Sequence, residues 1–204
     1  MSRWKRISLL VLLIIFFIIF ALYHGSTFGK WLDTNVYELL HSLYSAIVTT
    51  LFRVITSVGE VWSMAVLSCL LIGILVYKRY HAEALFFILA MALSTILNPL
   101  LKNIFDRERP DILRLVDVSG YSFPSGHAMG SMVFFGCLIY IVNRIFKGLT
   151  NKVMSTICAC LIVLICASRI YLGVHFPTDI LAGLCGGASC IILSTLVLRH
   201  KLKI

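Results

Sequence analysis

Three short segments of this chain carry the side chains that could do chemistry: residues 102–110 (KNIFDRERP), 124–127 (PSGH) and 168–179 (SRIYLGVHFPTD). Together they supply three cations, two histidines, a carboxylate four residues after the second histidine, and a Ser-Gly turn. A phosphoryl group in transfer carries negative charge on its three equatorial oxygens, which the protein has to neutralise and position. The inventory therefore suits metal-free phosphoryl transfer.

The cations are the candidate phosphate ligands. Arginine offers phosphate a planar fork of donors and stays charged at any relevant pH, so we predict that Lys102, Arg109 and Arg169 hold the phosphate. Arg107 and Arg114 lie in the same loop, and we interpret them as interfacial side chains that snorkel toward water.

Two histidines can titrate near neutral pH, so one is expected to attack phosphorus and the other to protonate the leaving oxygen. If a helix begins at Pro177, Asp179 falls in its first turn and can reach an imidazole N–H of His175. That bond would orient the ring and stabilise the imidazolium. We therefore predict His175 as the nucleophile and His127 as the general acid. The other histidines have no such neighbours and are interpreted as surface or interfacial: His24, His41, His81 and His200.

The second segment has the features of a helix start aimed at an anion. Ser125 precedes an apolar run and is a candidate N-cap, and Gly126 allows the backbone to approach a ligand closely. First-turn amides of a helix bind anions. We predict that Ser125 and Gly126 contribute to phosphate binding.

Neither metal nor another cofactor is predicted. The sequence contains no H-E-x-x-H motif and no cluster of Asp and Glu, and the neighbouring cations would repel a metal ion. The seven cysteines all lie in apolar stretches without a C-x-x-C pair, which is typical of packing residues.

The composition defines a membrane protein. Of the 204 residues, 60% are hydrophobic and 13% are charged, about half the charged fraction of a soluble domain. We predict an all-α polytopic membrane protein, one domain over residues 1–204 with its motif core at about 85–198. The net charge of +9 does not indicate nucleic-acid binding, because the cations cluster at the ends of apolar segments. No required protein partner is indicated.

About six spans are expected, each near the roughly 20 residues needed to cross a bilayer. The first, 7–23, is longer than a signal-peptide core and lacks a good cleavage site, so we interpret it as a retained helix. The stretch 24–59 predicts one or two amphipathic helices at the membrane surface, with a tilted span as the alternative. The remaining spans are 61–77, 83–101, 125–145, 153–171 and 177–198.

Charge predicts the orientation. Eleven of the 18 basic residues fall on one face: Arg3, Lys5, Arg6, Lys78, Arg79, Arg144, Lys147, Lys152, Arg199, Lys201 and Lys203. By the positive-inside rule, both termini are cytoplasmic and the motifs lie on the extracytoplasmic face of the cell membrane. Because spans alternate in direction, the three motifs are expected to converge at that face.

The three segments resemble the signature of the type 2 phosphatidic-acid phosphatase (lipid phosphate phosphatase) superfamily: K-x6-R-P, P-S-G-H and S-R-x5-H-x3-D. The resemblance covers about residues 85–198. It implies a six-helix membrane bundle, a phosphohistidine on His175 that water hydrolyses, protonation of the leaving group by His127, and phosphate binding without metal. The short chain and the F-x-R-x-R-P form of the first motif look most like bacterial members, which act on phosphatidylglycerophosphate, undecaprenyl diphosphate or both.

Other functions stay open at this point. A phosphohistidine can pass its phosphate to an alcohol, which would make the protein a lipid phosphotransferase. A vanadium haloperoxidase shares the motifs but is soluble. A lipid-binding or transport protein on the same scaffold would be expected to lose the catalytic histidines, and both are present. The substrate expected is a lipid phosphate, with membrane lipids as the surroundings.

Overall fold

The computed structural model describes residues 2–111 and 114–199. These residues form eight helices and no strand, so the predicted all-α polytopic membrane protein is confirmed. The helices are α1 (Arg3–Tyr23), α2 (Thr27–His41), α3 (Ala46–Val58), α4 (Val61–Tyr77), α5 (His81–Phe105), α6 (Gly126–Ile145), α7 (Leu149–Tyr171) and α8 (Pro177–Val197).

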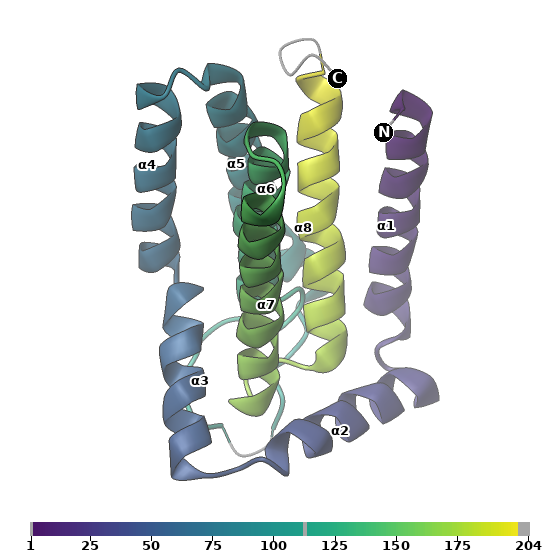
Figure 1. The fold of residues 1–204 in the computed structure, drawn as a ribbon. Helices are drawn as coiled ribbons and strands as arrows, with labels where there is room; N and C mark the ends of the chain where they lie inside the picture. The colour runs from purple at the N-terminus through teal and green to yellow at the C-terminus, as the bar shows by residue number, and fades with distance from the viewer. Residues whose placement is uncertain (1, 112–113, 200–204) are drawn as a thin grey trace.

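Five of these helices, α1, α5, α6, α7 and α8, are long and apolar enough to cross a membrane. The expected span at 61–77 forms a helix with those bounds, but its 17 residues make it shorter than the other five. At 1.5 Å per residue α4 is about 25 Å long, less than the roughly 30 Å of a bilayer core. Figure 1 shows α3 below α4 on the same side of the bundle.

The segment 24–59 folds as two helices, as predicted. Ser26 and Ser45 cap their first turns, accepting from Gly29 N and Val48 N. The helices meet at a bend of 117°, and together they pass as a broken span or re-entrant loop. Figure 1 shows α2 lying across the end of the bundle opposite to the start of α1 and the end of α8. Its place at the membrane surface stays a prediction.

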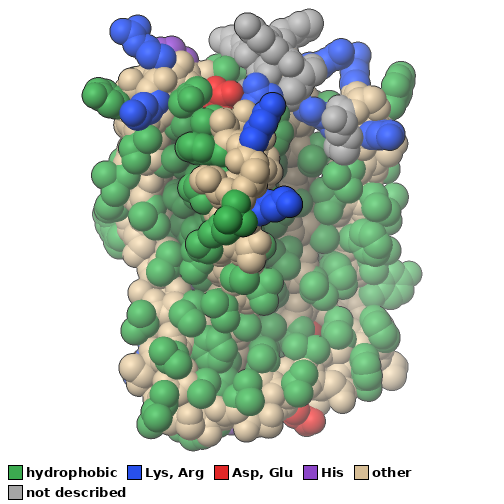
Figure 2. Space-filling model, viewed as in Figure 1, with side chains coloured by type: hydrophobic (Ala, Val, Ile, Leu, Met, Phe, Trp, Pro, Cys, Tyr) green, Lys and Arg blue, Asp and Glu red, His purple; other side chains and the backbone are tan. Residues whose placement is uncertain are grey.

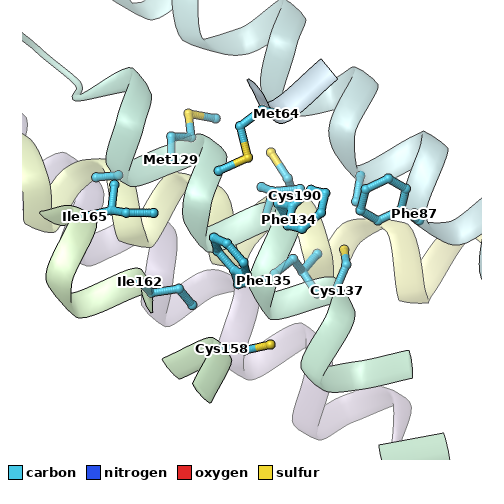
Figure 3. Close-up of a cluster of buried hydrophobic side chains, with 14 of the residues drawn as sticks. Met64, Phe87, Met129, Phe134, Phe135, Cys137, Cys158, Ile162, Ile165 and Cys190 are labelled. Carbon is cyan, nitrogen blue, oxygen red and sulfur yellow. The ribbon is translucent and has the colours of Figure 1, made fainter. Parts of the chain in front are cut away.

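The core lies between α5, α6, α7 and α8, where buried aromatic, aliphatic and sulfur-containing side chains interlock (Figure 3). Close packing of α8 on α6 depends on two glycines. A Cβ at Gly183 would lie 2.8 Å from the Ser125 carbonyl oxygen, and one at Gly187 would lie 2.7 Å from that of Met129. The small-x-x-x-small pair therefore brings the start of α8 against the start of α6.

The distribution of Lys and Arg over the surface agrees with the distribution predicted from the sequence. Figure 2 shows most Lys and Arg side chains of the visible face spread across the end of the bundle at which α1 begins and α8 ends, above a largely hydrophobic surface. The predicted basic residues Lys201 and Lys203 lie outside the described residues. The three motifs lie toward the opposite end of the bundle, where α2 crosses it.

Candidate active site

The first motif begins in the last turn of α5 and continues into a loop. Asp106 ends the helix in the left-handed conformation, with φ of 36°, which Asp tolerates better than most residues. The loop that follows is held by Arg109. Its guanidinium donates to the carbonyl oxygens of Gly120 and Ser119, at 2.8 and 3.1 Å, and Lys102 Nζ donates to the carbonyl oxygen of Tyr121. Both predicted cations therefore brace the loop that leads to the second motif.

The second motif starts α6 as predicted. Ser125 is the N-cap, and its hydroxyl accepts from Ala128 N at 3.4 Å. Asn98 of α5 donates to the Pro124 carbonyl oxygen, and its side-chain oxygen would lie 3.2 Å from a Cβ at Gly126. Ser125 N donates to the Asp179 carbonyl oxygen at 3.1 Å, which joins the second motif to the third.

The third motif turns from α7 into α8 around His175. Pro177 is the first residue of α8, as expected, and Asp179 in the first turn accepts from Phe176 N at 2.8 Å. The carboxylate oxygen Oδ2 of Asp179 lies 3.5 Å from His175 Nδ1. Ser122 lies between them, since its hydroxyl is 3.3 Å from Nδ1 and donates to the same carboxylate oxygen. Asp179 therefore faces His175 as predicted, with Ser122 as an additional partner.

The other ring nitrogen of His175 faces Arg109. Nη1 of Arg109 lies 3.4 Å from Nε2 and also donates to the Val174 carbonyl oxygen at 2.8 Å. Because arginine has donors only, Nε2 is the acceptor and the ring proton resides on Nδ1 beside Asp179. Burial lowers the pKa of His175 to about 4, although Asp179 acts in the opposite direction. The ring is therefore neutral at physiological pH, with a lone pair on Nε2.

His127 stands at the start of α6 within electrostatic reach of Arg169, His175, Arg109 and Lys102. Its Nε2 lies 3.4 Å from Glu60 Oε1 and forms no hydrogen bond with the described residues. The ring packs against the turn between α3 and α4, where a Cβ at Gly59 would lie 2.8 Å from His127 Cδ2. The two histidines and three cations are thus brought together at one end of the bundle.

Arg169 is nearly fully buried near the end of α7, with 2% of its surface exposed. Nη1 donates to Thr56 Oγ1 of α3 at 2.8 Å, and Nε has no hydrogen-bond partner among the described residues. Since a buried guanidinium is costly to leave unpaired, the free donor is one that a bound anion can satisfy.

Arg107 corrects the sequence interpretation. Its side chain does not snorkel but bridges two carboxylates, with Nη2 2.8 Å from Asp33 Oδ2 and Nη1 2.6 Å from Asp179 Oδ1. The guanidinium also stacks on the Phe176 ring, with 3.9 Å from Cζ to the ring centroid. A cation in a short loop would face the headgroups unless a buried acid competes, and α2 supplies that acid. Arg114, in contrast, donates to the Pro110 carbonyl oxygen.

Sequence reasoning missed four residues that contact the predicted ones, Thr56, Glu60, Arg107 and Ser122, and a fifth, Asp33, that contacts Arg107. Three belong to α2, α3 and the start of α4, which carry no motif. Arg107 was visible as part of the F-x-R-x-R-P form, whereas an isolated Ser or Thr gives no signal. Among the described residues, no group of three or more His, Cys, Asp or Glu is placed to hold a metal ion.

An apolar hollow lies among the membrane-spanning helices. It has a volume of about 390 Å³ and lies between α1, α5, α6 and α8, with Phe17, Leu101, Met129 and Leu193 among its walls. Leu101 directly precedes Lys102, and Met129 follows His127 by two residues. Two of its wall residues therefore stand within one helical turn of motif residues, and the rest of its wall lies in the apolar part of the bundle.

The helical bundle and the convergence of the three motifs at one of its ends together indicate a class of protein. The PAP2 superfamily profile matches residues 83–203, more than half of the chain, so the protein belongs to that superfamily. The resemblance stated from the three motifs is thereby confirmed.

Individual relatives are named as phosphatases. The chain is 35% identical over 113 residues to phosphatidylglycerophosphatase B of Bacillus subtilis, a match that covers 54% of this chain and about half (55%) of that protein's length. It is 28% identical over 170 residues to lipid A 4'-phosphatase of Porphyromonas gingivalis, covering 76% of this chain and 68% of the relative. The crystal structure of a transmembrane PAP2-type phosphatidylglycerolphosphate phosphatase from Bacillus subtilis superposes with a TM-score of 0.85, at 27% identity and 96% coverage of both chains.

Proposed function

We propose that this protein is a membrane phosphatase that hydrolyses the terminal phosphate of a lipid phosphate or diphosphate through a phosphohistidine on His175, without a metal ion. Undecaprenyl diphosphate, phosphatidylglycerophosphate or both are the proposed substrates. The observation that carries the proposal is the setting of His175. The ring is buried, its Nδ1 faces Asp179 and Ser122, and its Nε2 lone pair faces a guanidinium where a phosphate can bind.

The reaction has two displacements. The Nε2 lone pair of His175 forms a bond to phosphorus while the bond from phosphorus to the leaving oxygen breaks, and His127 gives that oxygen its proton. Asp179 stabilises the positive charge that develops on the ring. Water then attacks phosphorus, His127 takes its proton, and the bond from phosphorus to Nε2 breaks to release inorganic phosphate.

Charge stabilisation comes from the cations around the two rings. Arg169 Nε has no hydrogen-bond partner among the described residues, and Arg109 and Lys102 donate to backbone carbonyl oxygens. The amides that follow Ser125 in the first turn of α6 add dipoles with their positive ends outward. These groups match the equatorial oxygens of a transferring phosphoryl group.

The lipid part of the substrate is supported by the apolar hollow lined by Leu101 and Met129, whose walls suit an alkyl or prenyl chain. The orientation is supported by the basic residues at the end of the bundle opposite to the motifs. We therefore propose that both termini are cytoplasmic and that the site lies at the outer face of the cell membrane. A reporter fused after the last residue that proved external would overturn this orientation.

The decisive experiment measures phosphate release by purified His175→Ala from undecaprenyl diphosphate, phosphatidylglycerophosphate and phosphatidic acid. Loss of more than about 10³-fold is expected for all three, because the nucleophile is gone. His81→Ala is the matched control, since His81 is exposed at the start of α5, far along the chain from the motifs. Near-normal turnover by a folded His175→Ala protein would refute the mechanism.

Two further measurements distinguish the proposed hydrolysis from the alternative functions. Phosphate recovered on an acceptor lipid in place of free phosphate would establish phosphotransfer. Activity should survive chelation, and its loss on chelation followed by recovery with a divalent ion would establish a metallophosphatase.

A further inference from the structure

A chain of buried charges leads from α2 to the predicted nucleophile. Asp33 of α2 pairs with Arg107 at 2.8 Å, Arg107 pairs with Asp179 at 2.6 Å, and Asp179 faces His175 Nδ1 at 3.5 Å. The exposed fractions of the side chains are 7% for Asp33, 10% for Arg107 and zero for Asp179. Interactions between charges are stronger in such an environment than in water.

We infer that Asp33 is a positioning residue of the active site, which acts through Arg107 on the carboxylate that supports His175. The inference rests on the proposed function, since it concerns the same nucleophile. It assigns to α2, a helix without any motif, an indirect role in the chemistry, through Arg107.

The two oxygens of Asp179 serve different partners. Oδ1 pairs with Arg107, whereas Oδ2 accepts from Phe176 N and Ser122 and faces His175. Arg107 therefore competes with the developing imidazolium for the negative charge of one carboxylate. Asp33 balances Arg107, because its carboxylate is the second acid on the same guanidinium, which also donates to Thr178 Oγ1 at 2.7 Å.

Asp33 also fixes where this network stands relative to α8. Oδ1 accepts from Thr178 N at 2.9 Å and Oδ2 from Thr178 Oγ1 at 3.0 Å. The second residue of α8 is thus tied to α2 immediately before Asp179. These bonds occupy both oxygens of Asp33, so each oxygen of this buried carboxylate is hydrogen-bonded.

The charge of Asp33 has a predictable effect on the rate. When Asn replaces it, Arg107 keeps a single carboxylate partner and withdraws more charge from Asp179. Asp179 then stabilises the cation that forms on His175 less well, and phosphohistidine formation slows. Substrate binding changes little, because Asp33 faces Arg107 and Thr178 and not the cations predicted to hold phosphate. Arg109, Arg169 and His127 are the other charged or titratable groups around His175. They are unchanged between the wild type and Asp33→Asn.

The test compares Asp33→Asn with Glu38→Gln, which removes one acid from an exposed position of the same helix. With purified protein and phosphatidylglycerophosphate, Asp33→Asn is expected to lower kcat about tenfold while KM changes less than about twofold. Glu38→Gln is expected to match the wild type. Quenched single turnovers should assign the loss to phosphohistidine formation.

A double variant separates this role from simple support of α8. In an Arg107→Gln background the bonds from Thr178 to Asp33 can still form, but the route from Asp33 to Asp179 is removed. Asp33→Asn should therefore cause no further loss in that background. A further tenfold loss there would assign Asp33 to structural support and overturn the inference.

Two other outcomes decide the matter. A folded Asp33→Asn protein with wild-type kcat, alongside an inactive His175→Ala, would overturn the role of Asp33 while leaving the proposed function intact. If Asp33→Asn fails to fold, Asp33→Glu, which keeps the charge, is measured against Asp33→Gln. The inference requires the Glu variant to be the faster of the two, and equal rates would contradict it.

Discussion

The two halves of this molecule contribute to the site in different ways. Helices α5–α8 and their loops carry every residue that the motifs predicted to bind phosphate or to react. Helices α1–α4 carry no motif, yet Asp33, Thr56 and Glu60 contact Arg107, Arg169 and His127 respectively. The second half supplies the groups that we propose to react, and the first half supplies side chains that contact them or their partners.

The largest expected effect in the comparison comes from Arg169, and its partner Thr56 provides the contrast. Arg169→Gln should lower kcat about 10³-fold, because a buried cation that faces the transferred phosphate is lost. Thr56→Val removes only the hydroxyl that receives Nη1 and should cost about threefold. Phosphate release measured on both purified variants tests the pair. Equal losses would show that the division between the two halves is wrong.

The turn between α3 and α4 provides the next test. Gly59 has φ of −82°, which any residue adopts, so the effect of Gly59→Ala is purely steric. The new Cβ would lie 2.8 Å from His127 Cδ2 and 3.1 Å from Ile165 Cγ2, which forces the general acid to move. We expect kcat to fall about 100-fold, since small displacements of reacting groups have such costs.

The control for that variant is Gly73→Ala in α4, where a Cβ meets nothing within 4 Å. It should keep full activity and, as a helix-favouring change, should not lower the thermal stability. Wild-type activity in Gly59→Ala would mean that His127 is not held by the motif-free half.

The motif residues lie at helix ends, which is why their common location in the fold could be predicted. Lys102, Ser125, Arg169 and Asp179 each stand within a few residues of a predicted boundary, and alternating spans bring such boundaries to one face. Ser125 as N-cap and Asp179 in the first turn of α8 follow from local rules of helix starts. The convergence of the site was therefore predictable from the sequence.

What the sequence did not reveal are partners chosen by tertiary contact. Arg107 and Asp33 are 74 residues apart, and nothing in either segment marks the pair. A loop arginine between two spans usually faces headgroups, which is why the interpretation of Arg107 was wrong. In the sequence, Glu60 is an ordinary acidic residue before a helix. Only the packing of α3 and α4 places it beside His127.

The pH response of His175 sharpens the comparison further. Burial lowers its pKa from 6.5 to about 4, so the neutral nucleophile persists well into the acid range. At pH 5.5 a histidine of ordinary pKa would be about 90% protonated, whereas His175 should be less than about 10% protonated. Because the folded pKa is below the unfolded one, this group lowers the stability of the fold as the pH falls from 6.5 through about 4.

Imidazole ¹⁵N NMR of the protein in detergent micelles measures this pKa, with His175→Ala identifying the resonance. A titration near 6.5 would contradict the buried, neutral ring. Phosphate release is a poorer measure of this group, because the phosphate of the substrate titrates near pH 6 as well.

A smaller effect than for Arg169 or Gly59 is expected for Glu60, the acid that the motif-free half places 3.4 Å from His127 Nε2. A carboxylate at that distance would favour the protonated ring that the proposed general acid requires, so Glu60→Gln should slow protonation of the leaving oxygen about fivefold. The loss should appear with lipid phosphates, whose leaving alcohol needs the proton, and should vanish with p-nitrophenyl phosphate, whose leaving phenolate does not. Glu38→Gln controls for the change in net charge. Equal losses with both substrates would mean that Glu60 supports the fold of the site and not the proton transfer, and would place its role beside that of Thr56.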